Sequence, residues 1–250
     1  MRLVYRPAFI FTMGLIVQGI VMSTTISMGR TLSDDFLSAK VDRFSVHKIS
    51  MVGALLLLGR QEKFPLGVEY IDQQAVSKTL TLNIKSSTIA GALNAIVKTG
   101  KGYRWNIRNG VIDISNANIP ADSGNLLYKQ IPLFALPHRM PLEQANNILH
   151  ISLAAAIHPG LGTAGDFAVP TGATAVVGPL VLHHASVRDI LNSLVRDAQQ
   201  AAWIVKVPVV QLSSLPASGL WIIVEYNTMN VTDVEKMLRS NLCVEQSSHP

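Results

Sequence analysis

Histidine is the residue type in this chain most suited to holding a metal ion. His183 and His184 are adjacent, and neighbouring side chains on a strand point to opposite faces, so the pair would need further ligands. His138, His150 and His158 are available, but they show none of the spacings typical of zinc sites. We therefore predict no metal site and no cofactor.

A glycine-rich stretch is the second candidate for chemistry. Residues 160–165 read G-L-G-T-A-G, a literal match to the dinucleotide-binding pattern G-x-G-x-x-G. That pattern works only between a strand and a helix that begins within it, whereas here it follows a predicted helix. We predict a loop that binds no phosphate. Because long insertions often carry function, it is a candidate partner-contact loop, with Gly160, Gly162, Gly165, Asp166 and Phe167 as its candidate residues.

No pattern in the chain points to catalysis. Serine, histidine and aspartate are present, but no G-x-S-x-G motif marks a nucleophile. The single cysteine, Cys243, lies in a polar tail, either as an idle thiol or as half of an intermolecular disulfide. We predict no catalytic residues and expect that the protein is not an enzyme.

The composition narrows the class of protein. The chain has 250 residues, of which 48% are hydrophobic and 15% charged. Disorder needs the opposite balance, and among the uncharged stretches of about 18 residues or more only residues 8–28 are free of proline, as a membrane-spanning helix favours. One cysteine also excludes a scaffold of internal disulfides. A folded protein with a single candidate membrane segment is what the composition allows.

That segment lies at the N-terminus. Arg2 and Arg6 precede a run of 21 uncharged residues, Ala8 to Met28, which becomes polar at its end. This is the pattern of a secretory signal peptide, although a run of this length can also span a bilayer as an uncleaved anchor. Both interpretations of residues 1–29 place the remainder outside the cytoplasm, in the periplasm or cell envelope.

The charge is unevenly distributed. Residues 30–119 contain 12 Lys/Arg and 7 Asp/Glu, whereas residues 120–250 contain 7 and 9. The basic residues are scattered and not clustered as in nucleic-acid-binding proteins. A solvated surface is the preferred interpretation, and attraction to acidic lipid, wall polymer or an acidic protein face is the alternative.

An internal repeat organises the rest of the chain. T-I-A-G-A-L-N-A-I-V-K, beginning at Thr88, matches S-V-R-D-I-L-N-S-L-V-R, which begins 98 residues later at Ser186. The match extends without gaps from Leu82/Leu180 to Trp105/Trp203. The two tryptophans are expected to share a role in the core, and Asn94 and Asn192 are expected to make equivalent hydrogen bonds from a helix face.

Each copy predicts the same local structure. Residues 80–84 alternate in polarity as a strand, Thr88 or Ser87 is suited to capping a helix, and Asn109-Gly110 predicts a hairpin turn. The predicted fold class is therefore α+β, with two tandem modules of βαββαββ type. The predicted segments are module 1 (40–116), a linker (117–125), module 2 (126–228) with a loop insertion at 158–179, and a short C-terminal helix and tail (229–250).

The first module resembles the secretin and TonB short N-terminal (STN) domain over about residues 43–115. The residues that carry the resemblance are Phe44-Ser45-Val46, Ala54-Leu55-Leu56, Val68-Glu69-Tyr70, 80–84, 92–96, Gly102-Tyr103-Arg104-Trp105 and 110–114. These are hydrophobic patterns without a catalytic motif. The second module is similar only through the internal repeat.

The resemblance implies a non-enzymatic adaptor that assembles with proteins of the cell envelope or with copies of itself. It implies no binding of nucleic acid, and contact with a membrane only through the N-terminal segment. Because no channel domain follows in this sequence, a free-standing adaptor is the expected function. The alternatives are a periplasmic module that binds a small ligand or the cell wall, and, third, an enzyme.

Overall fold

The computed structural model describes residues 34–70, 78–118, 125–157, 174–206 and 221–243. Within these residues no helix is both long and apolar enough to cross a membrane. The predicted export segment, 1–29, and the candidate loop residues Gly160, Gly162, Gly165, Asp166 and Phe167 lie outside the described residues.

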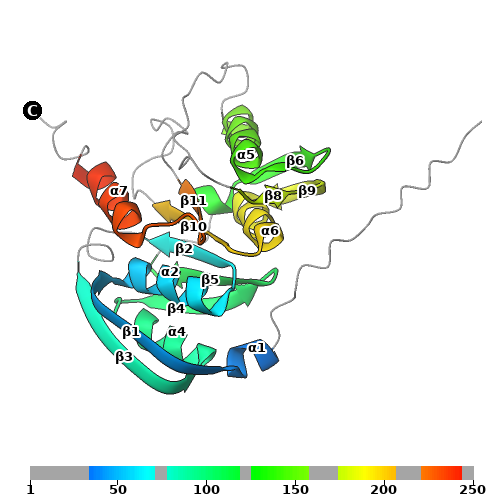
Figure 1. Cartoon of the computed structure of the whole chain (residues 1–250). Coiled ribbons are helices and arrows are strands. Elements are labelled where there is room, and N and C mark those ends of the chain that lie inside the picture. The colour runs from blue at the N-terminus through cyan, green and yellow to red at the C-terminus, as the bar shows by residue number, and fades with distance from the viewer. Residues whose placement is uncertain (1–33, 71–77, 119–124, 158–173, 207–220, 244–250) are drawn as a thin grey trace, which may run out of the picture.

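The described part of the first half contains three helices, a long two-stranded ribbon and part of a larger sheet (Figure 1). Its elements are α1 (Asp34–Ser38), β1 (Lys40–Ser50), α2 (Met51–Glu62), β2 (Leu66–Tyr70), β3 (Thr79–Thr88), α4 (Ile89–Val97), β4 (Tyr103–Arg108) and β5 (Val111–Asn116).

The second half has a similar order, but it adds β7 before the helix α5 and α7 at its end. Its elements are the 3₁₀ turn η1 (Leu126–Tyr128), β6 (Gln130–Leu136), β7 (Met140–Pro141), α5 (Leu142–Ile157), β8 (Val176–Val177), β9 (Leu180–Ser186), α6 (Val187–Ala198), β10 (Ala201–Lys206), β11 (Trp221–Glu225) and α7 (Val231–Cys243).

The α+β class is confirmed, but the tandem βαββαββ pattern is not. The described strands form a five-stranded sheet in the order β11-β10-β2-β5-β4, with the ribbons β1–β3 and β6–β9 and a short β7–β8 pair beside it. The parallel pairing of β10 with β2 joins the halves in one sheet. The sequence pattern did not predict this pairing, because a strand's hydrophobic alternation does not identify its neighbour. The domain boundaries themselves stay a prediction.

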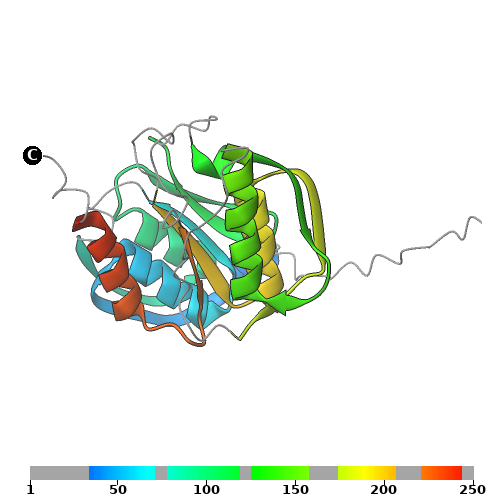
Figure 2. The same ribbon diagram turned by 90° about the horizontal axis from the view of Figure 1, so that it is seen from above.

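The layers follow from this shared sheet (Figure 1). One face of the sheet packs on α2 and α4, which the β1–β3 ribbon covers, and α7 packs against α2. The other face packs under α6, with α5 beside it, and the β6–β9 ribbon completes that side. Figure 2 shows α7 at one end of the molecule and the β6–β9 ribbon at the other.

The internal repeat is visible in the strand-to-helix junctions. Thr88 and Ser186 cap α4 and α6, their hydroxyls accepting from the backbone N–H groups of Gly91 and Asp189. Two residues before each cap, Ser86 and His184 have φ angles of 51° and 48°. Ser50 caps α2 in the same way, two residues after Lys48 with φ 51°. The predicted cap of the repeat is confirmed at Thr88 and Ser186, the cap at Ser50 was not predicted, and a residue with positive φ precedes each of the three.

The registers extend the repeat to the first strand of each half. Phe44 pairs with Ile84 in one ribbon, and Phe134 pairs with Leu182 in the other. Since Leu182 lies 98 residues after Ile84, Phe44 and Phe134 occupy equivalent places. The predicted hairpin at Asn109-Gly110 is also confirmed: both residues have positive φ, as a type I′ turn requires.

Candidate functional site: a buried charge cluster between the halves

The strongest concentration of buried charge lies where α6 covers the shared sheet. On β2, Leu66 and Val68 enter the core on the α2 side, so Glu69 faces α6. On β5, Ile112 and Ile114 likewise leave Asp113 on the α6 side. Both carboxylates are almost completely buried. The alternation that makes these strands good sheet members thus places two acids beneath one helix.

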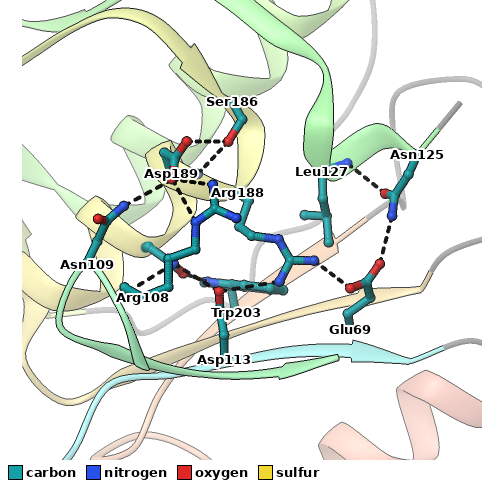
Figure 3. Close-up of polar contacts among 11 residues, drawn as sticks. Glu69, Arg108, Asn109, Asp113, Asn125, Leu127, Ser186, Arg188, Asp189 and Trp203 are labelled. Carbon is teal, nitrogen blue, oxygen red and sulfur yellow. Dashed lines mark hydrogen bonds and ion pairs between the residues drawn. The ribbon is translucent and has the colours of Figure 1, made fainter. Parts of the chain in front are cut away.

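Arg188, in the first turn of α6, forms ion pairs with both acids (Figure 3). Its Nη2 lies 2.5 Å from Oε2 of Glu69 and its Nη1 lies 3.3 Å from Oδ2 of Asp113. The guanidinium carbon also lies 5.4 Å from the ring centre of Tyr128 and 5.6 Å from that of Trp203. These are distances at which an arginine is attracted to aromatic faces.

Two asparagines complete the inner cluster. Asn192, one turn after Arg188, donates to Asp113 Oδ2 at 3.3 Å and accepts the indole N–H of Trp203 at 2.7 Å. Asn125 donates to Glu69 Oε1 at 2.8 Å and accepts from the backbone N–H of Leu127 at 3.0 Å. The predicted Asn192 hydrogen bond is confirmed. Asn125, which ends the predicted linker, is a buried part of the cluster.

A second, more exposed group continues the cluster toward solvent. Arg108 Nη2 lies 3.0 Å from Asp189 Oδ1, which also accepts from the side chain of Asn109 at 3.0 Å. Arg196 donates to the backbone carbonyl of Asn109 at 3.2 Å. These contacts clamp the β4–β5 hairpin of the first half to α6 of the second (Figure 3).

Burial controls the ionisation of the inner cluster. It raises the pKa of Asp113 above its ordinary value, against the opposing effects of Arg188 and Asn192. For Arg188, burial works to lower the pKa, but the charges of Asp113 and Glu69 outweigh it and raise the pKa. Within the described residues, Asp113 Oδ1 and Arg188 Nε have no hydrogen-bond partner. Arg188 therefore stays charged, while Asp113 is the group closest to taking up a proton.

Gly67 allows the sheet to approach the indole in this cluster. A Cβ at this position would lie 2.2 Å from Trp203 and 2.5 Å from Asp113 Oδ1. No side chain fits in that space, so strand β2 packs directly against the tryptophan. Glu69, Asp113 and Arg188 are almost completely buried, and their ion pairs form a latch between the two halves of the chain.

The residues that the sequence singled out are dispersed. His138, His183 and His184 are exposed, whereas His150 is buried and stacks on Trp221 with ring centres 4.0 Å apart. In the described part of the chain, no group of three His, Cys, Asp or Glu residues is placed to hold a metal ion. Cys243 is the last residue of α7. That the protein has no metal site, no cofactor and no catalytic residues stays a prediction.

Sequence reasoning missed the cluster, although a signal was present. Glu69 and Asp113 each interrupt a strand that is otherwise largely apolar, and Arg188 and Asn192 are one helical turn apart. A buried acid in such a strand requires a partner, which the strand alone does not identify. Comparisons with protein-family models, curated proteins and solved structures find no match to this chain.

Proposed function

We propose that the protein is a non-enzymatic adaptor of the cell envelope that docks partner proteins, as the resemblance to the STN domain implies. The single observation that carries the proposal is the apolar outer surface of the β6–β9 ribbon. Leu133 and Val181 are 53% and 58% exposed there, and Ala135 pairs with Val181 in the register. Residues directly opposite in an antiparallel pair share a face, so Leu133, Ala135 and Val181 lie on one outer surface, with His183 opposite Leu133.

The equivalent surface of the first half is polar. Arg43 pairs with Lys85 and Ser45 pairs with Asn83, at the places that Leu133–His183 and Ala135–Val181 occupy in the second half. The same strand geometry therefore tolerates polar residues, and packing within the chain does not require apolar ones. Exposed apolar surface of this kind is typical of contacts with other proteins.

Export is the second element of the proposal. It rests on the positively charged start and the uncharged run of residues 8–28. Mass spectrometry of the mature N-terminus from fractionated cells tests it. A protein that begins near residue 30 or retains the run in the membrane fraction supports export, and an intact, cytosolic chain contradicts it.

A photo-crosslinking amino acid in living cells tests docking at matched positions. Ala135→p-benzoylphenylalanine should give a discrete crosslinked product, whereas Ser45→p-benzoylphenylalanine, at the equivalent polar place, should give none. Leu133→Ser with Val181→Thr should abolish the product at position 135 without changing the amount of protein. Equal products at both positions, or a product that survives the double substitution, would contradict docking on this face.

One observation favours a second candidate function, the binding of an anionic polymer or lipid. Arg43 and Lys85 are exposed and directly opposite, an arrangement of like charges that destabilises a sheet pair. An anionic partner would relieve the repulsion. Retention on phosphatidylglycerol vesicles should then fall with added salt and with Arg43→Gln and Lys85→Gln together, and salt-independent retention would contradict it.

A further inference from the structure

The internal repeat relates the outer edge of β4 to an edge of β10. β4 is the last strand at its side of the sheet, and no strand of the described residues pairs with its outer edge. Residues 103–108 of β4 lie 98 positions before residues 201–206 of β10. Each of these strands pairs through one edge with the strand that follows it, β5 or β11. The outer edge of β4 is thus equivalent to the other edge of β10.

That edge of β10 holds a strand. β2 runs parallel to β10, with Leu66 opposite Ala202, Gly67 opposite Trp203 and Val68 opposite Ile204. The pairing of β2 with β10 therefore shows what an edge of this kind binds. It binds an extended segment that runs parallel to it and has a glycine beside the tryptophan.

The two tryptophans show the effect of the added strand. Trp105 donates to Asn94 at 2.8 Å and Trp203 donates to Asn192 at 2.7 Å, so both have the same partner on their own helix. Trp203, against which Gly67 packs, is completely buried, whereas Trp105 is only half-buried and Asn94 is exposed. The indole on β4 lacks the cover that its counterpart has.

We propose that the outer edge of β4 accepts an extended, acidic segment of a partner protein as a parallel strand, with a small residue beside Trp105. This inference deepens the proposed docking function and rests on it. Backbone hydrogen bonds along the edge supply affinity, and the side chains on the two faces supply specificity.

Charge selects the occupant. The face of β4 opposite Trp105 carries Arg104, Asn106 and Arg108, and the strand contains no acidic residue. Arg108 is paired with Asp189, whereas Arg104 is exposed and no described residue forms a salt bridge with it. A second copy pairing through its own β4 would bring arginines together, which disfavours self-association at this edge. An acidic segment places its carboxylates beside Arg104.

The register specifies a probe. A fluorescein-labelled peptide with the sequence of residues 64–70, in which Leu66→Glu and Val68→Glu are introduced, places acids beside Arg104 and Asn106 and keeps Gly67 beside Trp105. Fluorescence anisotropy with the full chain should show saturable binding. Arg104→Glu should weaken it about tenfold, and so should Gly67→Leu in the peptide, while Lys236→Glu on the exposed side of α7 should not.

Crosslinking tests the direction of the strand. In a Cys243→Ser background, Asn106→Cys should form a disulfide with a peptide that carries Val68→Cys, because the parallel register places position 68 beside Asn106. It should not form one with a peptide that carries its cysteine at the N-terminal end, which this register places away from Asn106. Absent binding, binding unaffected by Arg104→Glu, or equal binding after Gly67→Leu would overturn the inference. If the crosslink at position 135 persists in any of these cases, the docking function stands and only the β4 edge is wrong.

Discussion

The two halves of the chain share a folding pattern and differ in where that pattern meets the rest of the molecule. Both place a capped helix after a ribbon strand and connect it to a tryptophan through an asparagine. In the second half that helix packs on β2 and β5 of the other half as well as on strands of its own, whereas the strands β1, β3 and β4 that α4 contacts belong to its own half. The same local structure therefore serves as an edge in one half and as part of an interface in the other.

Two positions of the repeat carry charged residues in the second half and small residues in the first. Arg188 and Asp189 of α6 correspond to Ala90 and Gly91 of α4. The charged pair faces Glu69, Asp113 and Arg108 of the first half, and the small pair has no such partners to meet. The charges at these two positions join the two halves.

Among the variants that test this comparison, removal of Arg188 should cause the largest loss of unfolding free energy. Arg188→Met leaves Glu69 and Asp113 buried without their counter-charge, and breaking a buried pair in this way costs about 3–5 kcal/mol. Urea unfolding should show that loss, while Arg239→Met, which removes a half-exposed arginine, should change stability by less than about 1 kcal/mol.

A triple variant separates loss of charge balance from loss of packing. Adding Glu69→Gln and Asp113→Asn to Arg188→Met removes the uncompensated charges and should recover a large part of the stability. If the triple variant is no more stable than Arg188→Met, packing and not charge holds the halves together.

The tryptophan pair should show an intermediate effect. Trp203→Phe leaves Asn192 Oδ1 buried without its donor, which costs about 1–3 kcal/mol in addition to lost packing. Trp105→Phe exposes the equivalent oxygen of Asn94 to water, so it should cost clearly less. Equal losses of unfolding free energy in the two variants would show that burial does not distinguish the halves.

The sequence predicted what is local. Alternating polarity, the hydroxyl caps and the Asn109-Gly110 turn are encoded within a few residues, and the structure has them at Thr88, Ser186 and the β4–β5 hairpin. The repeat also predicted that Asn94 and Asn192 make equivalent hydrogen bonds, but it did not identify the tryptophans as their partners.

What joins the halves was not predictable in this way. The pairing of β2 with β10 links residues more than a hundred positions apart, and neither strand carries a mark of its partner. The strands of Glu69 and Asp113 did not identify a partner for either acid, because the partner arrives with α6. The cluster is a product of the assembled sheet.

Asp113 should show the smallest effect, visible mainly in its dependence on pH. Because burial raises its pKa in the folded state, the folded protein binds a proton more tightly than the unfolded chain does. The stability cost of a charged Asp113 is present at neutral pH and is relieved as the pH falls through the raised pKa toward the ordinary value of about 3.9.

The variant Asp113→Asn, which cannot ionise, should lack this contribution. The difference in unfolding free energy between the two proteins should therefore shift in favour of the unsubstituted chain as the pH falls from 7 toward that ordinary value, and Asp189→Asn serves as the half-exposed control. A difference between Asp113→Asn and the unsubstituted chain that is constant over this range, or that moves the other way, would show that Arg188 holds Asp113 ionised and that the latch is a fixed ion pair at every pH tested.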